Sequence, residues 1–192
     1  MSVADQWDAT RARQRSRQVA TGGAALALAV VLPAALHPFG LGPVLLPMHL
    51  VVLVTAGLAG PVPAALAGAL APLTSWALTG MPPLSPPVAP LMTIELAAYG
   101  GAAGVVWRWL GGRFGSGARG RAVLAAGLTL VAAIAASKLA LAAGAALFGP
   151  MLGLRVPVST YLMGAALVGV PGIVLQAAVA PLIFGRVRRG NG

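Results

Sequence analysis

Residues 91–107 read LMTIELAAYGGAAGVVW, a stretch that is apolar or small almost throughout and contains one carboxylate, that of Glu95. Glu95 is also the only acidic residue after Asp8. A charged side chain in hydrocarbon costs at least about 3 kcal/mol, so such residues usually face a bundle interior or a water-filled cavity and mark substrate or ion sites. The only lysine, Lys138, lies in another apolar run, which allows a buried ion pair with Glu95.

The composition around this stretch is that of an integral membrane protein. Of the 192 residues, 58% are hydrophobic and only 8% are charged, whereas about a quarter of the residues of a soluble domain are charged. The length allows about six spans of roughly 20 residues each, which leaves no room for a separate catalytic domain. Any ATPase that works with this protein is therefore expected to be another chain.

Apolar runs separated by Pro, Gly or Arg clusters predict an all-α integral membrane bundle of six transmembrane helices. The membrane domain is expected over residues 19–185, between a basic N-terminal segment at 1–18 and a basic tail at 186–192. The predicted spans are Val19–Leu36, Val44–Ala59, Val62–Leu78, Pro90–Trp107, Ala122–Phe148 and Ser159–Phe184.

The arginines predict the orientation of this bundle in the cell membrane. If both termini are cytoplasmic, eleven arginines lie inside and only Arg155 lies outside, as the excess of basic residues in cytoplasmic loops requires. A cleaved signal peptide in place of the first span is the less favoured alternative, because an even number of spans returns the basic tail to the inside. The net charge of +10 does not indicate nucleic acid, because the basic residues flank apolar runs.

Small residues and prolines shape the expected helices and loops. Alanines at small-xxx-small spacing in the first helix let another helix approach closely, either inside the chain, which is favoured, or in a partner protein. The external loops are rich in proline or glycine, and residues 80–87 read GMPPLSPP, which predicts either a shaped lid or a plain connector. The alanines in question are Ala20, Ala24, Ala25 and Ala29.

Four polar residues fall at similar depths in different predicted spans. Counted from the expected cytoplasmic helix ends at about 1.5 Å per residue, they lie about 14 to 24 Å into a core roughly 30 Å thick. With Tyr161 and Arg155 above them, they are placed to line one cavity open to the outside. Such a set suits a small polar or zwitterionic molecule, with aromatic rings at Tyr99, Tyr161 or Trp76. The four are Gln176, His49, Glu95 and Lys138.

Each of these residues also has a structural interpretation. Glu95 and Lys138 can form an ion pair that only holds two helices together, and the lysine can extend toward the outer interface. His49 can be a satisfied histidine at a helix start. Gln176 can make a hydrogen bond between helices.

Enzymatic motifs are scarce in this sequence. There is no HExxH metal pair, no GxSxG elbow and no GxxxxGK[ST] phosphate loop. Residues 115–120 do match GxGxxG, but that motif needs a preceding strand within a βαβ unit, and here it joins two predicted membrane helices. We therefore expect a protein that is not an enzyme, with no metal and no cofactor of its own.

Four motifs together resemble those of the substrate-specific S components of energy-coupling factor (ECF) transporters, over about residues 19–185. They are LPMHL at 46–50, TGMPP at 79–83, ELAAYG at 95–100 and VPGIVLQ at 170–176, the last followed by Pro181. The resemblance implies a six-helix subunit that binds a vitamin or vitamin precursor near the outer face. It also implies partners: a transmembrane coupling protein and two cytoplasmic ATPases that use ATP.

Site residues follow from the resemblance by position. Glu95 and Gln176 become pocket candidates, His49 and Met81 become candidates on the loop side, and the four alanines of the first helix become contacts for the coupling protein. S components often carry several polar or aromatic residues in the last two helices, whereas the fifth predicted helix offers little beyond Ser137 and Lys138. A compact heteroaromatic vitamin, such as a pyridine or pyrimidine, would suit a small pocket with one carboxylate.

Three other functions remain as alternatives at this point. The first is a stand-alone ion-coupled transporter in which Glu95 is the proton site. The second is an intramembrane enzyme that uses Glu95 and His49 as acid and base. The third is a structural or assembly subunit that binds no small ligand.

Overall fold

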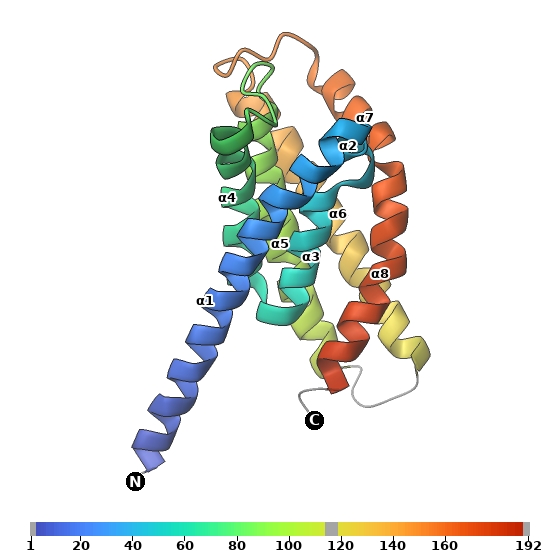
Figure 1. The fold of residues 1–192 in the computed structure, drawn as a ribbon. Coiled ribbons are helices and arrows are strands. Elements are labelled where there is room, and N and C mark those ends of the chain that lie inside the picture. Colours follow the sequence, from blue (N-terminus) through green and yellow to red (C-terminus); the bar gives the residue numbers. More distant parts are fainter. Residues whose placement is uncertain (1–2, 114–118, 190–192) are drawn as a thin grey trace.

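The computed structural model describes residues 3–113 and 119–189, and within these ranges every regular element is a helix (Figure 1). The all-α expectation is confirmed for this part of the chain. In chain order the elements are α1 (Val3–Leu36), the 3-10 turn η1 (His37–Phe39), α2 (Gly42–Leu45), α3 (Pro47–Ala59), α4 (Pro61–Thr79), α5 (Val88–Arg113), α6 (Arg119–Phe148), α7 (Val158–Val168) and α8 (Val170–Arg189).

Several of these helices are long and apolar enough to cross a membrane, so the chain is a multi-pass membrane protein. Among the described residues there are five such spans: α1, α2 with α3, α4, α5 and α6. A sixth is present if α7 and α8, which meet at an angle of 54°, are counted as one broken span. The start of α1 and the end of α8 lie at the same end of the bundle, opposite the α4–α5 and α6–α7 loops (Figure 1).

Four helix boundaries differ clearly from those predicted by the sequence. Helix α5 continues to Arg113, beyond the predicted end at Trp107. The first helix begins at Val3 and not at Val19, because the basic segment continues the same helix. The second predicted span is interrupted at Leu46, whose φ of 48° and ψ of 52° are left-handed. Leu46 precedes Pro47, and the proline ring disfavours the right-handed helical conformation at the residue before it. The last predicted span is divided near Gly169, between α7 and α8.

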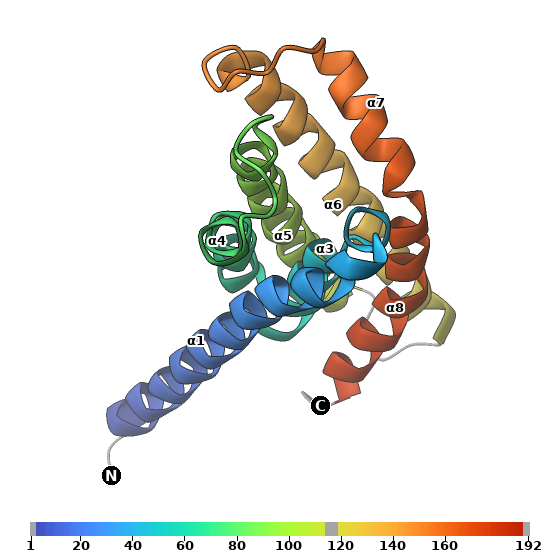
Figure 2. The same ribbon diagram turned by 45° about the horizontal axis from the view of Figure 1, so that its top comes forward.

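The centre of the bundle is occupied by α3, which contacts α1, α4, α5 and α8 (Figure 2). Helix α1 crosses over α3 and α4 and contributes Ala25 and Ala29 to the core, where they are 5% and 0% exposed. The prediction that these two alanines contact a partner protein is therefore wrong. Their burial agrees with the alternative that they pack inside the chain. On α8, the Phe184 ring stacks on Trp107 of α5 with centroids 4.4 Å apart.

Helices α4 and α5 approach so closely that glycine is required between them. A Cβ placed on Gly100 of α5 would lie 2.6 Å from the carbonyl oxygen of Ala64 on α4. Gly104 meets the backbone of Pro61 in the same way, one helical turn further along. Small residues spaced four apart allow this kind of contact between membrane helices. The close contact fixes α5, which carries Glu95, against its neighbour.

Candidate functional site

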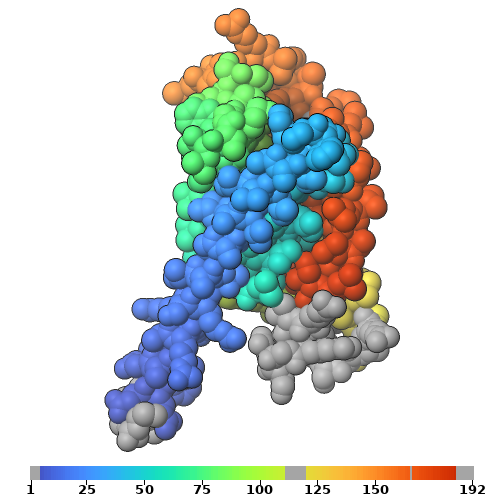
Figure 3. Space-filling model, viewed as in Figure 1, coloured from blue at the N-terminus to red at the C-terminus, as the bar shows by residue number. Residues whose placement is uncertain are grey.

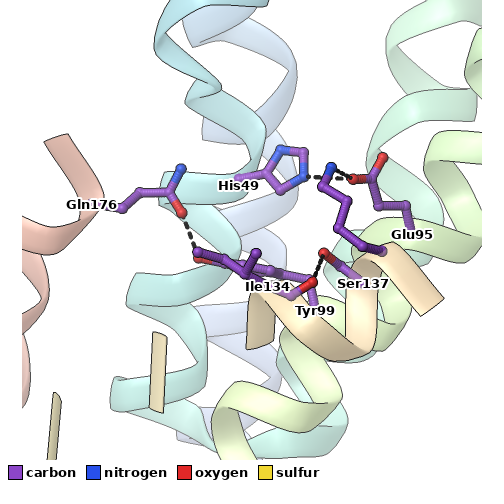
Figure 4. A network of polar contacts seen from close by, with 7 residues as sticks. His49, Glu95, Tyr99, Ile134, Ser137 and Gln176 are labelled. Atoms are coloured by element: carbon purple, nitrogen blue, oxygen red, sulfur yellow. Dashed lines mark hydrogen bonds and ion pairs between the residues drawn. The ribbon is translucent and has the colours of Figure 1, made fainter. Parts of the chain in front are cut away.

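Glu95 lies in the bundle interior, 4% exposed, and one of its oxygens is shared by two basic side chains (Figure 4). Nζ of Lys138, on α6, donates to Oε1 of Glu95 at 2.5 Å. Nε2 of His49, on α3, lies 3.6 Å from the same oxygen, which is too long for a hydrogen bond. Three helices thus meet at one carboxylate.

The two ends of the Glu95–Lys138 ion pair differ in exposure. The Glu95 side chain is 6% exposed, whereas that of Lys138 is 33% exposed. A buried carboxylate is tolerated in the membrane when it is paired, and removing one partner leaves a charge without compensation. Lys138 is therefore the more exposed end of the pair, and Glu95 is the end that lies in the interior.

A second set of contacts continues the cluster toward α8. The hydroxyl of Tyr99 donates a hydrogen bond to Oε1 of Gln176, and the Tyr99 ring meets the His49 ring edge-on, with centroids 5.3 Å apart. Tyr99 is four residues after Glu95, so one face of α5 presents both side chains. We call His49, Glu95, Tyr99, Lys138 and Gln176 the Glu95 network; they come from α3, α5, α6 and α8.

Gln176 has one unpartnered donor. Its side chain is buried, at 1% exposed. Oε1 accepts from Tyr99, but among the residues that the structure describes Nε2 has no hydrogen-bond partner. An unsatisfied buried polar group costs about 1–3 kcal/mol. Most such groups in folded proteins are paired, so each exception needs a reason such as a bound water, an ion or a function.

Three predicted site residues lie outside the Glu95 network. Tyr161 of α7 packs, half-buried, against the small apolar cluster of Leu91 and Leu141, near enough to Glu95 to be affected by its charge. Met81 is 42% exposed in the α4–α5 loop, and Arg155 is exposed in the α6–α7 loop. Both loops lie at one end of the bundle (Figure 1). The structure therefore does not bring Met81 or Arg155 into direct contact with the carboxylate.

Sequence reasoning placed four residues of the Glu95 network at similar depth and named Tyr99 only as an available aromatic ring, but it missed how the five are connected. The spacing of Glu95 and Tyr99, four residues apart on one helix, was the available signal that both serve one site. The edge-on contact between His49 and Tyr99 and the Tyr99–Gln176 hydrogen bond depend on how α3 and α8 are rotated, which no local pattern encodes. Hydropathy identifies a helix but does not fix its rotation to within one side chain.

The chemistry available in the Glu95 network is that of charge and hydrogen bonding. Glu95 is an acceptor, Lys138 and Gln176 are donors, and His49 and Tyr99 supply rings with polar edges. Within residues 3–113 and 119–189, no three His, Cys, Asp or Glu side chains are grouped to hold a metal ion. The arrangement is able to neutralise and orient a small molecule that carries both polar groups and a flat ring.

Comparisons of the chain with known protein families, with curated proteins and with solved structures gave no match.

Proposed function

We propose that this chain is the substrate-binding membrane subunit of an importer of the ECF type, and that the Glu95 network is its binding site for a vitamin or vitamin precursor. The observation that supports this most is the unpartnered Gln176 donor, whose amide is linked through Tyr99 to the face of α5 that carries Glu95. The lysine partner of that carboxylate is one-third exposed. A purely structural ion pair explains the Glu95–Lys138 contact but not the free amide.

The geometry suggests which part of a ligand each residue would contact. A cationic or N–H group would meet Glu95, an acceptor would meet Gln176 Nε2, and an anionic group would meet Lys138, which would leave Glu95 to the ligand. The half-buried ring of Tyr161 would contact a flat heterocycle. A ligand acceptor that meets Gln176 Nε2 would satisfy a buried donor, and this favours tight binding.

The proposal includes six spans, with α7 and α8 counted as one, and both termini in the cytoplasm. The arginine bias supports this orientation. In it, the α4–α5 and α6–α7 loops, with Met81 and Arg155, face outward and the Glu95 network lies in the outer half of the membrane. A transmembrane coupling protein would contact α1 at Ala20 and Ala24, which are exposed, and two cytoplasmic ATPases would hydrolyse ATP. The chain itself would catalyse no reaction.

Ligand affinity in the purified protein tests this proposal. The small molecule that co-purifies is first identified by native mass spectrometry, and its dissociation constant is then measured for the wild type and for Glu95→Gln. We expect more than about tenfold weaker binding in the variant, because a charge-assisted hydrogen bond contributes about 1.5–3 kcal/mol.

A matched control is available on the same helix. Thr93 lies two residues from Glu95, and its hydroxyl already donates to the carbonyl of Ala89 at 3.1 Å. Thr93→Val should leave the affinity unchanged. Equal affinity of Glu95→Gln and the wild type, with both folded, would remove Glu95 from the binding site.

A stand-alone ion-coupled transporter is the second candidate, favoured by one specific observation. Lys138 and His49 approach the same oxygen of Glu95, an arrangement in which a proton can be exchanged between buried groups. Uptake that persists without any ATPase and stops with a protonophore would favour this candidate. Uptake that requires the coupling protein and ATPases would favour the ECF-type subunit.

A further inference from the structure

The N-terminal half of α1 projects from the bundle as an isolated helix (Figure 3). Residues 5–17 are all exposed, although they continue the same helix that later packs across α3 and α4. Residues 9–18 hold four arginines and no acidic residue. We call residues 9–18 the arginine arm. Its function is not explained by the Glu95 network, which lies inside the bundle.

The four arginines lie on two opposite sides of the helix. At 3.6 residues per turn, positions two apart are about 200° apart, whereas positions four apart share a face. Arg11 and Arg15 accordingly line one shallow groove, with Gln14 and Gln18. Arg13 and Arg17 line a separate one, with Ala12 and Ser16.

This pattern differs from that of a helix that lies flat on a membrane. Such a helix needs one apolar face to insert and one basic face to remain in water. The arginine arm has basic side chains on both sides, so it has no apolar face to insert. A protein partner that docks along one side of the arm would contact one arginine pair and leave the other pair in water.

The position of the arm along α1 matches the headgroup layer. Val19, where the apolar run begins, is 76% exposed on the bundle surface. The arginines precede it by two to eight residues, which is about 3 to 12 Å along the helix. The polar layer of a bilayer is about 5 to 8 Å thick on each side, and arginine side chains reach several ångströms back toward it.

We propose that the arginine arm binds the phosphates of anionic phospholipids, which surround the helix on both sides where it leaves the membrane. Charge complementarity supports this occupant, because basic residues next to a membrane span attract anionic headgroups by about a factor of five for each residue. The two-sided arrangement also fits lipids, which are present all around an emerging helix. This inference needs only a membrane-spanning α1 and does not depend on the proposed transport function.

Lipid titration of the full-length protein, followed by native mass spectrometry, tests the proposal. The probes are dioleoyl phosphatidylglycerol and, for comparison, dioleoyl phosphatidylcholine. Two double variants carry the same change of charge on opposite sides: Arg11→Gln with Arg15→Gln, and Arg13→Gln with Arg17→Gln. We expect each to lower the number of phosphatidylglycerol molecules retained by the protein by about half, because one arginine pair remains. Phosphatidylcholine binding should be unchanged.

Two further measurements sharpen the test. Gln14→Ala, on the arginine arm itself, changes a side chain without changing the charge and should bind phosphatidylglycerol like the wild type. Raising ammonium acetate from about 0.1 M to about 1 M, which shortens the Debye length from about 10 Å to about 3 Å, should weaken binding to the wild type more than to either double variant.

Three results would overturn the proposal. One is a wild-type number of retained phosphatidylglycerol molecules in both double variants. Another is a loss confined to one of them, which would indicate a one-sided contact such as a protein surface. The third is an equal loss of phosphatidylcholine binding, which would indicate that the variants disturb the fold instead of a charge contact.

Discussion

At the scale of single residues, the placement of Glu95 depends on two basic side chains from different helices. Lys138 makes the hydrogen bond, at 2.5 Å, and His49 adds a contact at 3.6 Å to the same oxygen. Both a structural pair and a ligand site require this carboxylate to stay ionised in the membrane. In the structural interpretation the Glu95–Lys138 pair is permanent. In the ligand-site interpretation a ligand separates the pair and contacts both side chains itself.

A double-mutant cycle measures the energy of the pair. Glu95→Gln and Lys138→Met should each lower the melting temperature of the protein in detergent, because each leaves one charge without its partner. The double variant should be more stable than the sum of the two losses predicts, by about 0.5–3 kcal/mol of coupling. Losses that simply add would show that the two side chains do not interact in the folded protein.

At the scale of helices, close backbone contact between α4 and α5 holds the helix that carries Glu95 and Tyr99. Gly100 and Gly104 lie on the contact side of α5, but Gly101, between them, does not: a Cβ on Gly101 would sit 3.7 Å from that of Ala65, an ordinary contact. Two neighbouring glycines thus have opposite roles, and a comparison of the two separates packing from helix propensity.

Alanine substitutions at these two glycines should have opposite effects. Gly101→Ala should be neutral or raise the melting temperature, because alanine favours a helix over glycine by about 1 kcal/mol. Gly100→Ala should lower it, because the new methyl group would lie 2.6 Å from the carbonyl oxygen of Ala64 and overpacking costs about 1–3 kcal/mol. Equal melting temperatures for the two variants would contradict the close α4–α5 contact.

Local pattern predicted the helices well but not their interruptions or contacts. The apolar runs gave the bodies of α3, α4, α5 and α6 within a few residues, because hydropathy over some 20 residues is a local property. The break at Leu46 follows from Pro47 and was readable in principle. The angle at Gly169 and the meeting of Tyr99 with Gln176 depend on packing between distant segments, for which the sequence carries no local signal.

At the scale of the whole molecule, α1 and α8 begin and end at one side of the bundle, as an even number of spans requires (Figure 1). Having both ends on one side fits either orientation in the membrane, with the termini inside or outside. Only the arginine bias supports cytoplasmic termini. The side of the membrane on which the termini lie matters for function. It decides whether the loops with Met81 and Arg155 face the cell exterior or the cytoplasm.

The orientation can be determined by labelling single introduced cysteines, because the chain has no cysteine of its own that would also react. Ser85, in the α4–α5 loop, and Ser16, on the arginine arm, are both exposed. A membrane-impermeant maleimide added to intact cells should label Ser85→Cys and should label Ser16→Cys only after the cells are opened. The reverse pattern would place the termini outside and would remove the basis for an outward-facing site.

The most direct test of the proposed binding site is native mass spectrometry of the purified chain, compared with Glu95→Gln and Thr93→Val. We predict one small molecule bound per chain in the wild type and in Thr93→Val, with a mass in the range of a vitamin or its precursor. Glu95→Gln should retain markedly less of it under the same conditions. Folded wild-type protein that never carries a small molecule, even after exposure to a vitamin mixture, would contradict the proposal and leave the Glu95 network as a structural link between helices.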